Sequence, residues 1–463
     1  MSFIIVLLAL VLLMFVAYRG FSVILFAPVC ALLAVLATDP SLVMPVFSGI
    51  FMRKMVGFIE LYFPVFLLGA VFGKVIELSG FSKSIVSAVI ALVGRDRAML
   101  SIVLVCALLT YGGVSLFVVV FAVYPFAAEM FRQSDIPKRL IPGTIALGAF
   151  TFTMDALPGT PQIQNIIPST FFQTNGWAAP WLGVVGSIFI LVMGLAYLGW
   201  RRRRAAAAGE GYGTNLVNEP EPFTQEKLPS PWIALAPLVI VGVMNKVFTG
   251  LIPQFYGTTH VTELPGLAKP MTTQVSSVIG VWAVEGALLL GIVTVVVLAF
   301  GSIHARFVDG SKTAIAGSLL AAMNTASEYG FGGVIAALPG FLVVADALKS
   351  IPNVLVNEAV TVTALAGMTG SASGGMSIAL ATMADSFIQA ANAANVPLEV
   401  LHRVASMASG GMDTLPHNGA VITLLAVTGL THRTSYIDIF SITMIKTLAV
   451  LVVIAMYYMT GIY

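Results

Sequence analysis

Charged residues are scarce in this sequence of 463 residues. Lysine and arginine number 23, aspartate and glutamate number 21, and together they make up 10% of the chain, against about 25% in an ordinary soluble protein. Hydrophobic residues make up 58%. So few charges could not cover the surface of a soluble domain of this size. The composition therefore excludes a soluble enzyme, a nucleic-acid-binding protein and a disordered chain.

Cysteine is also scarce, with only two residues in the chain. Cys30 and Cys106 both lie inside apolar runs, where a cysteine usually packs as a small hydrophobic residue. No disulfide framework is implied, and no cluster of histidine and cysteine suggests a metal site. We expect no metal and no cofactor.

Continuous apolar blocks recur from one end of the sequence to the other. Blocks of about 17–25 residues are typical of membrane-spanning helices, and a β-barrel would show shorter alternating segments. The first block, Phe3 to Val16, lacks the basic start and the cleavage site of a signal peptide. We therefore interpret it as a retained span, and we predict an all-α polytopic membrane protein with about 10–12 membrane segments.

The most charged segment divides the chain into two halves. It runs from Arg201 to Pro231 and begins with four consecutive arginines, which the positive-inside rule places in the cytoplasm. We predict a first membrane repeat at 1–200, a solvated linker at 201–231 and a second repeat at 232–463.

The two halves resemble each other in sequence. Four short matches occur in the same order at nearly constant separation: Gly73–Phe81 with Gly333–Phe341, Gly112–Ser115 with Gly374–Ser377, Ile136–Pro137 with Val396–Pro397, and Met154–Pro158 with Met412–Pro416. The loop 132–139 is basic whereas its counterpart 392–397 is not, and the reverse holds for the turn at 38–40 and its counterpart 304–312. The basic loops thus predict inverted repeats, as in many secondary transporters.

Two segments of each half are poor simple spans. The run 98–109 is too short to cross a membrane, and with the following run 116–131 it predicts a re-entrant hairpin whose tip is 110–115. Its counterpart is 359–390, with a glycine-rich tip at 367–375. The next run, 140–172, is too long for one span.

Proline and glycine interrupt this long run at 155–161, and its counterpart is interrupted at 410–419. Unwound backbone at membrane depth is tolerated only inside protein or beside a watery cavity, and free helix ends there suit ions. We therefore predict a binding site at the middle of the membrane, formed by two hairpin tips and two broken transmembrane helices.

Acidic side chains at these breaks are the candidates for coupling. Asp155 and Asp413 are equivalent acids of the two repeats, and intramembrane acids are usually functional; the alternative role is a helix cap. His417 is four residues after Asp413 and could relay protons, although a lone histidine is more often a satisfied polar group. Glu328 is a weaker candidate for ion coupling.

Polar residues and tip glycines could hold a substrate carboxylate. The candidates are Gly113, Ser115, Thr160, Gln162, Asn165, Ser371, Ser373, Thr414 and Asn418. For each side chain, a local hydrogen bond to the backbone is an equally good interpretation.

At these residues the chain resembles the gluconate permease (GntP) family of proton-coupled organic-acid transporters. The resemblance lies in the Gly69-x-x-x-Gly73-Lys74 span, the Gly-Val-Ser tip, the Ile-Pro turn and the Leu157-Pro158-Gly159-Thr160-Pro161 break, and it covers most of the chain outside the linker. The first break here has no histidine, unlike that of gluconate-type members. The resemblance implies uptake of a small hydroxy- or carboxylic acid.

We therefore expect a symporter in a bacterial inner membrane that takes up a small organic anion with H⁺, or with Na⁺. The lipid bilayer and the organic anion are the expected partners, nucleic acid is not, and a homodimer is left open. A cation/proton antiporter without organic substrate is the main alternative. An intramembrane aspartyl protease lacks the Gly-x-Gly-Asp context, and Gly69–Lys74 is one residue too short for a phosphate loop.

Overall fold

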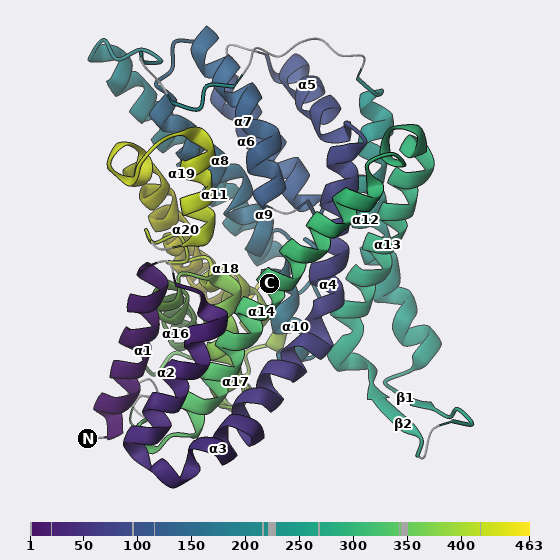
Figure 1. The fold of residues 1–463 in the computed structure, drawn as a ribbon, viewed down its shortest axis with the longest axis vertical. Helices are drawn as coiled ribbons and strands as arrows, with labels where there is room; N and C mark the ends of the chain where they lie inside the picture. The colour runs from purple at the N-terminus through teal and green to yellow at the C-terminus, as the bar shows by residue number, and fades with distance from the viewer. Residues whose placement is uncertain are drawn as a thin grey trace.

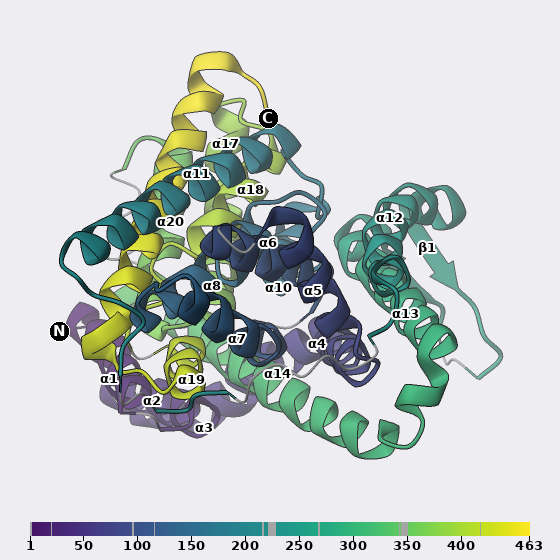
Figure 2. The same ribbon diagram turned by 90° about the horizontal axis from the view of Figure 1, so that it is seen from above.

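The computed structural model describes residues 2–19, 21–94, 97–114, 116–214, 217–220, 228–266, 269–341, 343, 351–416 and 418–463. Helices form almost all of the regular structure in these residues (Figures 1 and 2). The exception is a two-stranded antiparallel sheet of β1 (Thr259–Thr262) and β2 (Met271–Gln274), which projects from one end of the bundle in Figure 1. The fold is all-α, as the sequence predicts.

The first half of the chain contributes the helices up to the linker. In order they are α1 (Ser2–Tyr18), α2 (Val23–Thr38), η1 (Pro40–Leu42), α3 (Val43–Val46), the π-helical turn η2 (Phe47–Phe51), α4 (Met52–Leu78), α5 (Phe81–Val93), α6 (Ala98–Tyr111), α7 (Leu116–Gln133), η4 (Lys138–Leu140), α8 (Ile141–Ala149), α9 (Phe152–Asp155), α10 (Ile163–Phe172) and α11 (Pro180–Ala207).

The second half repeats much of this order. Its helices are α12 (Pro231–Tyr256), α13 (Val275–Ile303), α14 (Phe307–Ala337), α16 (Val354–Thr369), α17 (Ala372–Ala393), α18 (Leu398–Ser409), α19 (Gly419–Thr428) and α20 (His432–Thr460). Each half therefore has a long helix, then a helical hairpin, then a broken helix, then a final long helix. The two hairpins lie in opposite halves of Figure 1, with α6 and α7 above and α16 and α17 below.

Five helical stretches of the described residues are long and apolar enough to cross a membrane. They are Pro40–Leu78, Pro180–Ala207, Pro231–Tyr256, Val275–Ile303 and His432–Thr460. Their outer faces expose large apolar side chains such as Trp232, Val297 and Phe300, which in water would form an unfavourable surface. These helices make the chain an integral membrane protein.

Both predicted helix breaks are present. Between α8 and α10 the backbone leaves the helix at Phe150 and Thr151, makes the single turn α9, and stays irregular to Gln162. Between α18 and α19 the backbone is irregular from Gly410 to Pro416. The prolines of both segments lack the N–H that a helical hydrogen bond needs, and the glycines have low helix propensity, so both breaks occur where the sequence predicts them.

The segment expected to be a solvated linker is partly docked on the helices. Helix α11 continues through the four arginines to Ala207, and Tyr212 beyond it is only 9% exposed. The Lys138 backbone N–H donates to the Tyr212 carbonyl, and its ammonium donates to the Val217 carbonyl at 2.6 Å. The linker therefore packs on the turn between α7 and α8 instead of standing free in solvent.

Candidate functional site

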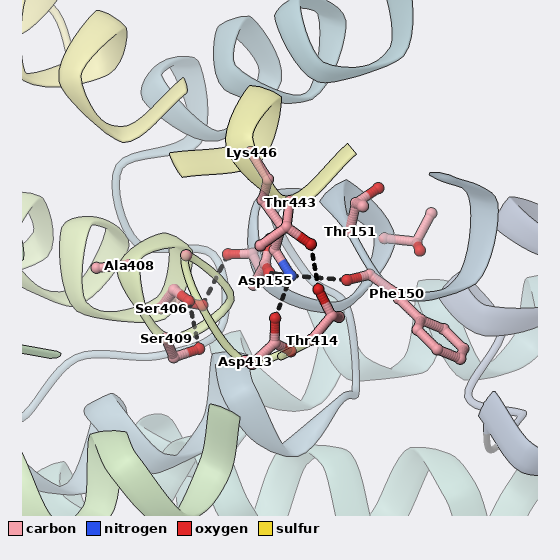
Figure 3. A network of polar contacts seen from close by, with 12 residues as sticks. Phe150, Thr151, Asp155, Ser406, Ala408, Ser409, Asp413, Thr414, Thr443 and Lys446 are labelled. Atoms are coloured by element: carbon pink, nitrogen blue, oxygen red, sulfur yellow. Dashed lines mark hydrogen bonds and ion pairs between the residues drawn. The ribbon is translucent and has the colours of Figure 1, made fainter. Parts of the chain in front are cut away.

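The two helix breaks meet beside α20 (Figure 3). Asp155 ends the short helix α9 in the first break, and Asp413 lies in the second. Helix α20 brings Lys446 between them, so that three charged side chains from three segments converge. All three are buried, with exposed fractions of 1% for Asp155, 9% for Asp413 and 2% for Lys446.

The Lys446 ammonium bridges the two acids. Its Nζ lies 3.0 Å from Asp155 Oδ2 and 3.6 Å from Asp413 Oδ1, and it donates a hydrogen bond of 2.7 Å to the Phe150 carbonyl at the end of α8. Within these three side chains two carboxylates and one ammonium leave one negative charge, and the buried Arg403 guanidinium, 3.2 Å from the Asp155 carbonyl oxygen, is a second cation beside them. Such a charge is costly away from water unless another cation or a proton neutralises it.

The Asp155 carboxylate does not act as a helix cap. No backbone N–H of the described residues donates to either of its oxygens or to Asp413 Oδ1. Their close neighbour is the ammonium of Lys446. For Asp155 this favours the coupling role over the capping role, because a cap accepts backbone N–H groups.

One face of α20 is polar and turned toward the second break. Lys446 and Thr447 follow Thr443 by three and four residues and therefore lie on the same side of the helix as it does. The hydroxyls of Thr443 and Thr414 form a short hydrogen bond, and the Thr447 hydroxyl donates to the Gly411 carbonyl. The face thus holds the second break against the Lys446 ammonium.

Glycine at position 410 makes the close approach of these groups feasible. A Cβ atom there would overlap the end of the Lys446 side chain and Asp155 Oδ2. The ion pair therefore occupies the space that any larger residue would need.

Arg403 on α18 joins the second half to the first break. It is fully buried, and its guanidinium donates to the carbonyls of Asp155 at 3.2 Å, Gly176 at 3.4 Å and Ala178 at 2.8 Å, and to Asn165 Oδ1 at 3.0 Å. These acceptors all belong to the first half. Arg403 thus connects the second half of the chain to the first by hydrogen bonds, and its N–H groups are occupied by backbone and amide oxygens.

Two of the predicted substrate-binding side chains hold the hairpin tips instead of standing free. The Gln162 amide donates to the Thr110 carbonyl at the tip of the first hairpin, at 2.7 Å. In the other half the Asn418 amide donates to the Gly370 carbonyl at the tip of the second hairpin, also at 2.7 Å. Each break is therefore latched to the hairpin of its own half.

The other predicted donors are also bonded within the protein. The Thr160 hydroxyl donates to the Thr153 carbonyl at 2.7 Å, and the Asn165 amide donates to the Thr160 and Gly176 carbonyls. Ser371 caps the N-terminus of α17 by accepting from the Gly374 N–H, and Ser373 pairs with Thr325 on α14 at 3.3 Å.

Gly113 turns the first hairpin at φ +94°, a conformation that favours glycine. At this position of the tip, only backbone N–H and carbonyl groups are present to contact a substrate. Ser115 and His417, which the sequence analysis also selected, lie outside the described residues.

Lys446 and Arg403 are the charged residues that the sequence analysis missed. Lys446 is a lone lysine in a long apolar run, flanked at helical spacing by Thr443 and Thr447. Arg403 and the neighbouring His402 stand just before the second break. An intramembrane charge is itself a functional signal, but the sequence does not show which acid or carbonyl each one meets.

A surface pocket of about 700 Å³ lies away from this cluster, on the face where the linker docks. It is lined by Arg132, Asp135, Gly211, Tyr212, Gly213, Thr214 and Glu219. Arg132 is already paired with Glu129 and Glu219 at 3.0 and 2.6 Å. The pocket therefore offers an organic anion no unpaired arginine, and we place the functional site at the breaks.

The comparisons with known proteins agree with a transporter. No family model matches the chain. The fold is similar to that of the Alcanivorax borkumensis YdaH transporter, with a TM-score of 0.54, 16% identity and coverage of 89% of this chain and 88% of that one. It is also similar to Neisseria gonorrhoeae MtrF, from a class of antimetabolite efflux pumps, with a TM-score of 0.52, 12% identity and coverage of 87% and 82%.

The sequence is much closer to a relative from Bacillus subtilis (strain 168), the uncharacterized transporter YxjC. The two share 59% identity over 470 residues, which covers 100% of both chains. Identity at this level over the whole length establishes kinship, whereas the two solved structures establish the fold alone. The chain therefore belongs to the same transporter family as YxjC.

Proposed function

We propose that the chain is a secondary active transporter that takes up a small organic anion, such as a hydroxy- or carboxylic acid, together with H⁺. The observation that carries the proposal is the position of Lys446 between Asp155 and Asp413, where the two helix breaks meet. Substrate sites of transporters with broken helices lie at such a meeting point.

The charge balance of this cluster links a proton to an anion. When both carboxylates are ionised, Lys446 is shared between them and has little attraction left for a third negative group. A proton on Asp155 or Asp413 removes one competing charge, and the ammonium can then bind a substrate carboxylate. Proton and anion would therefore bind together, which is the requirement for symport.

The arrangement of the chain in the membrane is part of this proposal. We assign the first repeat to 1–200, the linker to 201–231 and the second, inverted repeat to 232–463, in a bacterial inner membrane with the linker on the cytoplasmic side. The four consecutive arginines at the linker support this orientation. The resemblance to gluconate permeases supports an organic acid as substrate.

A cation/proton antiporter without organic substrate is the second candidate, and one observation favours it. The side chains expected to bind a carboxylate, such as Gln162, Thr160 and Asn418, are already bonded within the protein. An exchanger would need only the two acids and the lysine, and Na⁺ could then replace H⁺ at the carboxylates.

Reconstitution into proteoliposomes separates the two candidates. Counterflow and uptake are measured with a panel of labelled acids, including gluconate, lactate and succinate, with and without a pH gradient. Accumulation of one acid that follows the pH gradient supports symport, and Na⁺/H⁺ exchange without any organic acid supports the antiporter. Export against the imposed gradient would oppose the direction proposed here.

The coupling groups are tested with Asp155→Asn and Asp413→Asn. We expect both variants to lose accumulation driven by a pH gradient. Uptake that keeps the wild-type pH dependence in both variants would show that the proton binds elsewhere.

A further inference from the structure

Glu328 on α14 is a buried acid outside the central cluster. Its exposed fraction is 3%, and its side chain lies against the first turn of α17, where a Cβ atom on Gly374 would overlap its carboxylate oxygens. The Ser371 hydroxyl is hydrogen-bonded to this carboxylate, whereas Oε2 has no hydrogen-bond partner among the described residues. The Glu328 carboxylate therefore points at the tip of the second hairpin, and its Oε2 atom is left to accept a further hydrogen bond or bind a proton.

The packing of α14 on α17 fixes this position. Thr325 pairs with Ser373 one turn before Glu328, and Gly332 packs on Ile378 one turn after it. The N-terminal end of α17, with its unpaired N–H groups and positive end of the helix dipole, thus faces the carboxylate. A substrate carboxylate would be attracted to the same place.

The charged surroundings of Glu328 are sparse. The first turns of helix α4 carry Arg53, Lys54 and Glu60, all exposed; the Lys54 side chain packs on Gly333, and its ammonium lies 5.9 Å from the centre of the Tyr329 ring. Helix α17 carries one acid, Asp385, far along the helix from Gly374, and the described residues of α2 and η2 carry no charged side chain. The helix end and Ser371 are therefore the closest polar partners of the acid.

The two halves differ at this point. The match of Gly73–Phe81 with Gly333–Phe341 places Leu68 of α4 where the second half has Glu328. The first hairpin therefore has no acid equivalent to Glu328, and any direct effect of the Glu328 carboxylate is confined to the second hairpin.

We propose that Glu328 is a proton-binding carboxylate that competes with the anionic substrate for the N-terminal end of α17. When ionised it occupies this end and excludes a second negative group; when protonated it leaves the end to a substrate carboxylate. This inference deepens the proposed anion–H⁺ symport and rests on it.

The tip also connects Glu328 to the central cluster. Gly370 at the tip accepts the hydrogen bond of Asn418 from the second break, and Gly367 packs on Met412 next to Asp413. A change at the N-terminus of α17 can therefore reach the second break through direct contacts.

The test measures binding and proton uptake in purified wild-type protein, Glu328→Gln and the control Glu285→Gln, which changes a half-buried acid of α13. Gluconate, lactate and succinate are the probes, and a pH-sensitive dye in weak buffer reports protons taken up on binding. In the wild type the apparent affinity for the bound acid should fall by at least about tenfold per pH unit once the pH is high enough for Glu328 to lose its proton.

Glutamine resembles the protonated acid, so Glu328→Gln should bind the anion with a shallower pH dependence, which comes from Asp155 and Asp413 alone, and take up fewer protons than Glu285→Gln. Ser371→Ala keeps the acid but removes its hydroxyl partner, and it should displace the midpoint of the pH profile. A folded Glu328→Gln variant that keeps the wild-type pH profile, or that no longer binds the anion, would overturn the inference. Wild-type protein that binds none of the acids would instead overturn the proposed function.

Discussion

Gln162 and Asn418 make the same contact in the two halves of the chain. Each projects an amide from a helix break and donates 2.7 Å hydrogen bonds to a carbonyl at the tip of the neighbouring hairpin, Thr110 in one half and Gly370 in the other. The breaks and the hairpins therefore form two latched units. Any motion that opens the site must either carry each unit as one body or break these bonds.

Removing a latch should loosen its hairpin. We expect Gln162→Ala and Asn418→Ala each to destabilise the protein by about 1–3 kcal/mol, because a buried carbonyl loses its donor, and to weaken apparent substrate affinity. Thermal unfolding in detergent and transport assays measure the two effects. Asn392→Ala, at an exposed position near the end of α17, is the control and should change neither.

Lys446 should be essential because it is the counter-ion of two buried acids. We expect Lys446→Met to destabilise the protein by about 3–5 kcal/mol, the usual cost of leaving a buried charge unpaired, and to abolish uptake. Adding Asp155→Asn to this variant should restore part of the thermal stability, since one of the two stranded charges is removed. Lys312→Met, at an exposed lysine, should behave like wild type; equal stability of Lys446→Met and wild type would contradict the ion-pair assignment.

Gly410 should tolerate no side chain. A methyl group there overlaps Lys446 and Asp155, and we expect Gly410→Ala to separate the pair and reduce uptake at least as much as Asp155→Asn. Gly419→Ala is the matched control, because nothing lies within 4 Å of a Cβ atom at that position. Transport by the two variants at equal protein amounts decides the matter, and normal uptake by Gly410→Ala would show that the close approach is not needed.

The docked linker should contribute stability that depends on pH. Arg139 donates two hydrogen bonds to Glu210 at 2.6 and 2.7 Å, and these bonds lower the pKa of the Glu210 carboxyl below its ordinary value of 4.5. A lowered pKa in the folded state means that the contribution is complete above about pH 4.5 and is lost as the pH falls through the folded-state pKa.

Glu210→Gln should therefore unfold at a lower temperature than wild type at pH 7. The carboxylate is 40% exposed, so the difference should stay below about 1 kcal/mol. Thermal unfolding of the two proteins between pH 7 and pH 4 measures it, and a difference that grows on acidification would have the wrong sign for this ion pair.

The architecture could be read from the sequence because it depends on local signals. Length and hydrophobicity predict the spans, and the clustered prolines and glycines at 155–161 and 410–419 predict the breaks. The acids Asp155 and Asp413 were found by the same reasoning, since they stand at those breaks.

The partners within the site could not be predicted in this way. Lys446 lies more than 30 residues beyond Asp413 in the chain, and only tertiary packing decides that its ammonium reaches both acids. Gln162 and Asn418 have the chemistry to bind a carboxylate, but a carbonyl at a hairpin tip uses the same donors. The linker looks solvated from its charges, yet Arg139 and Lys138 pair with Glu210 and Glu219 and hold it against the helices.

The bonds of Arg403 also bear on how the chain matures. Every acceptor described for its guanidinium belongs to a segment that the ribosome makes first, from Asp155 to Ala178. Until α18 has been synthesised, the carbonyls of this early segment lack the donor that Arg403 provides. The later segment, if synthesised alone, would contain the Arg403 guanidinium without its hydrogen-bond acceptors. Two separately expressed polypeptides should consequently need each other to escape quality-control proteolysis.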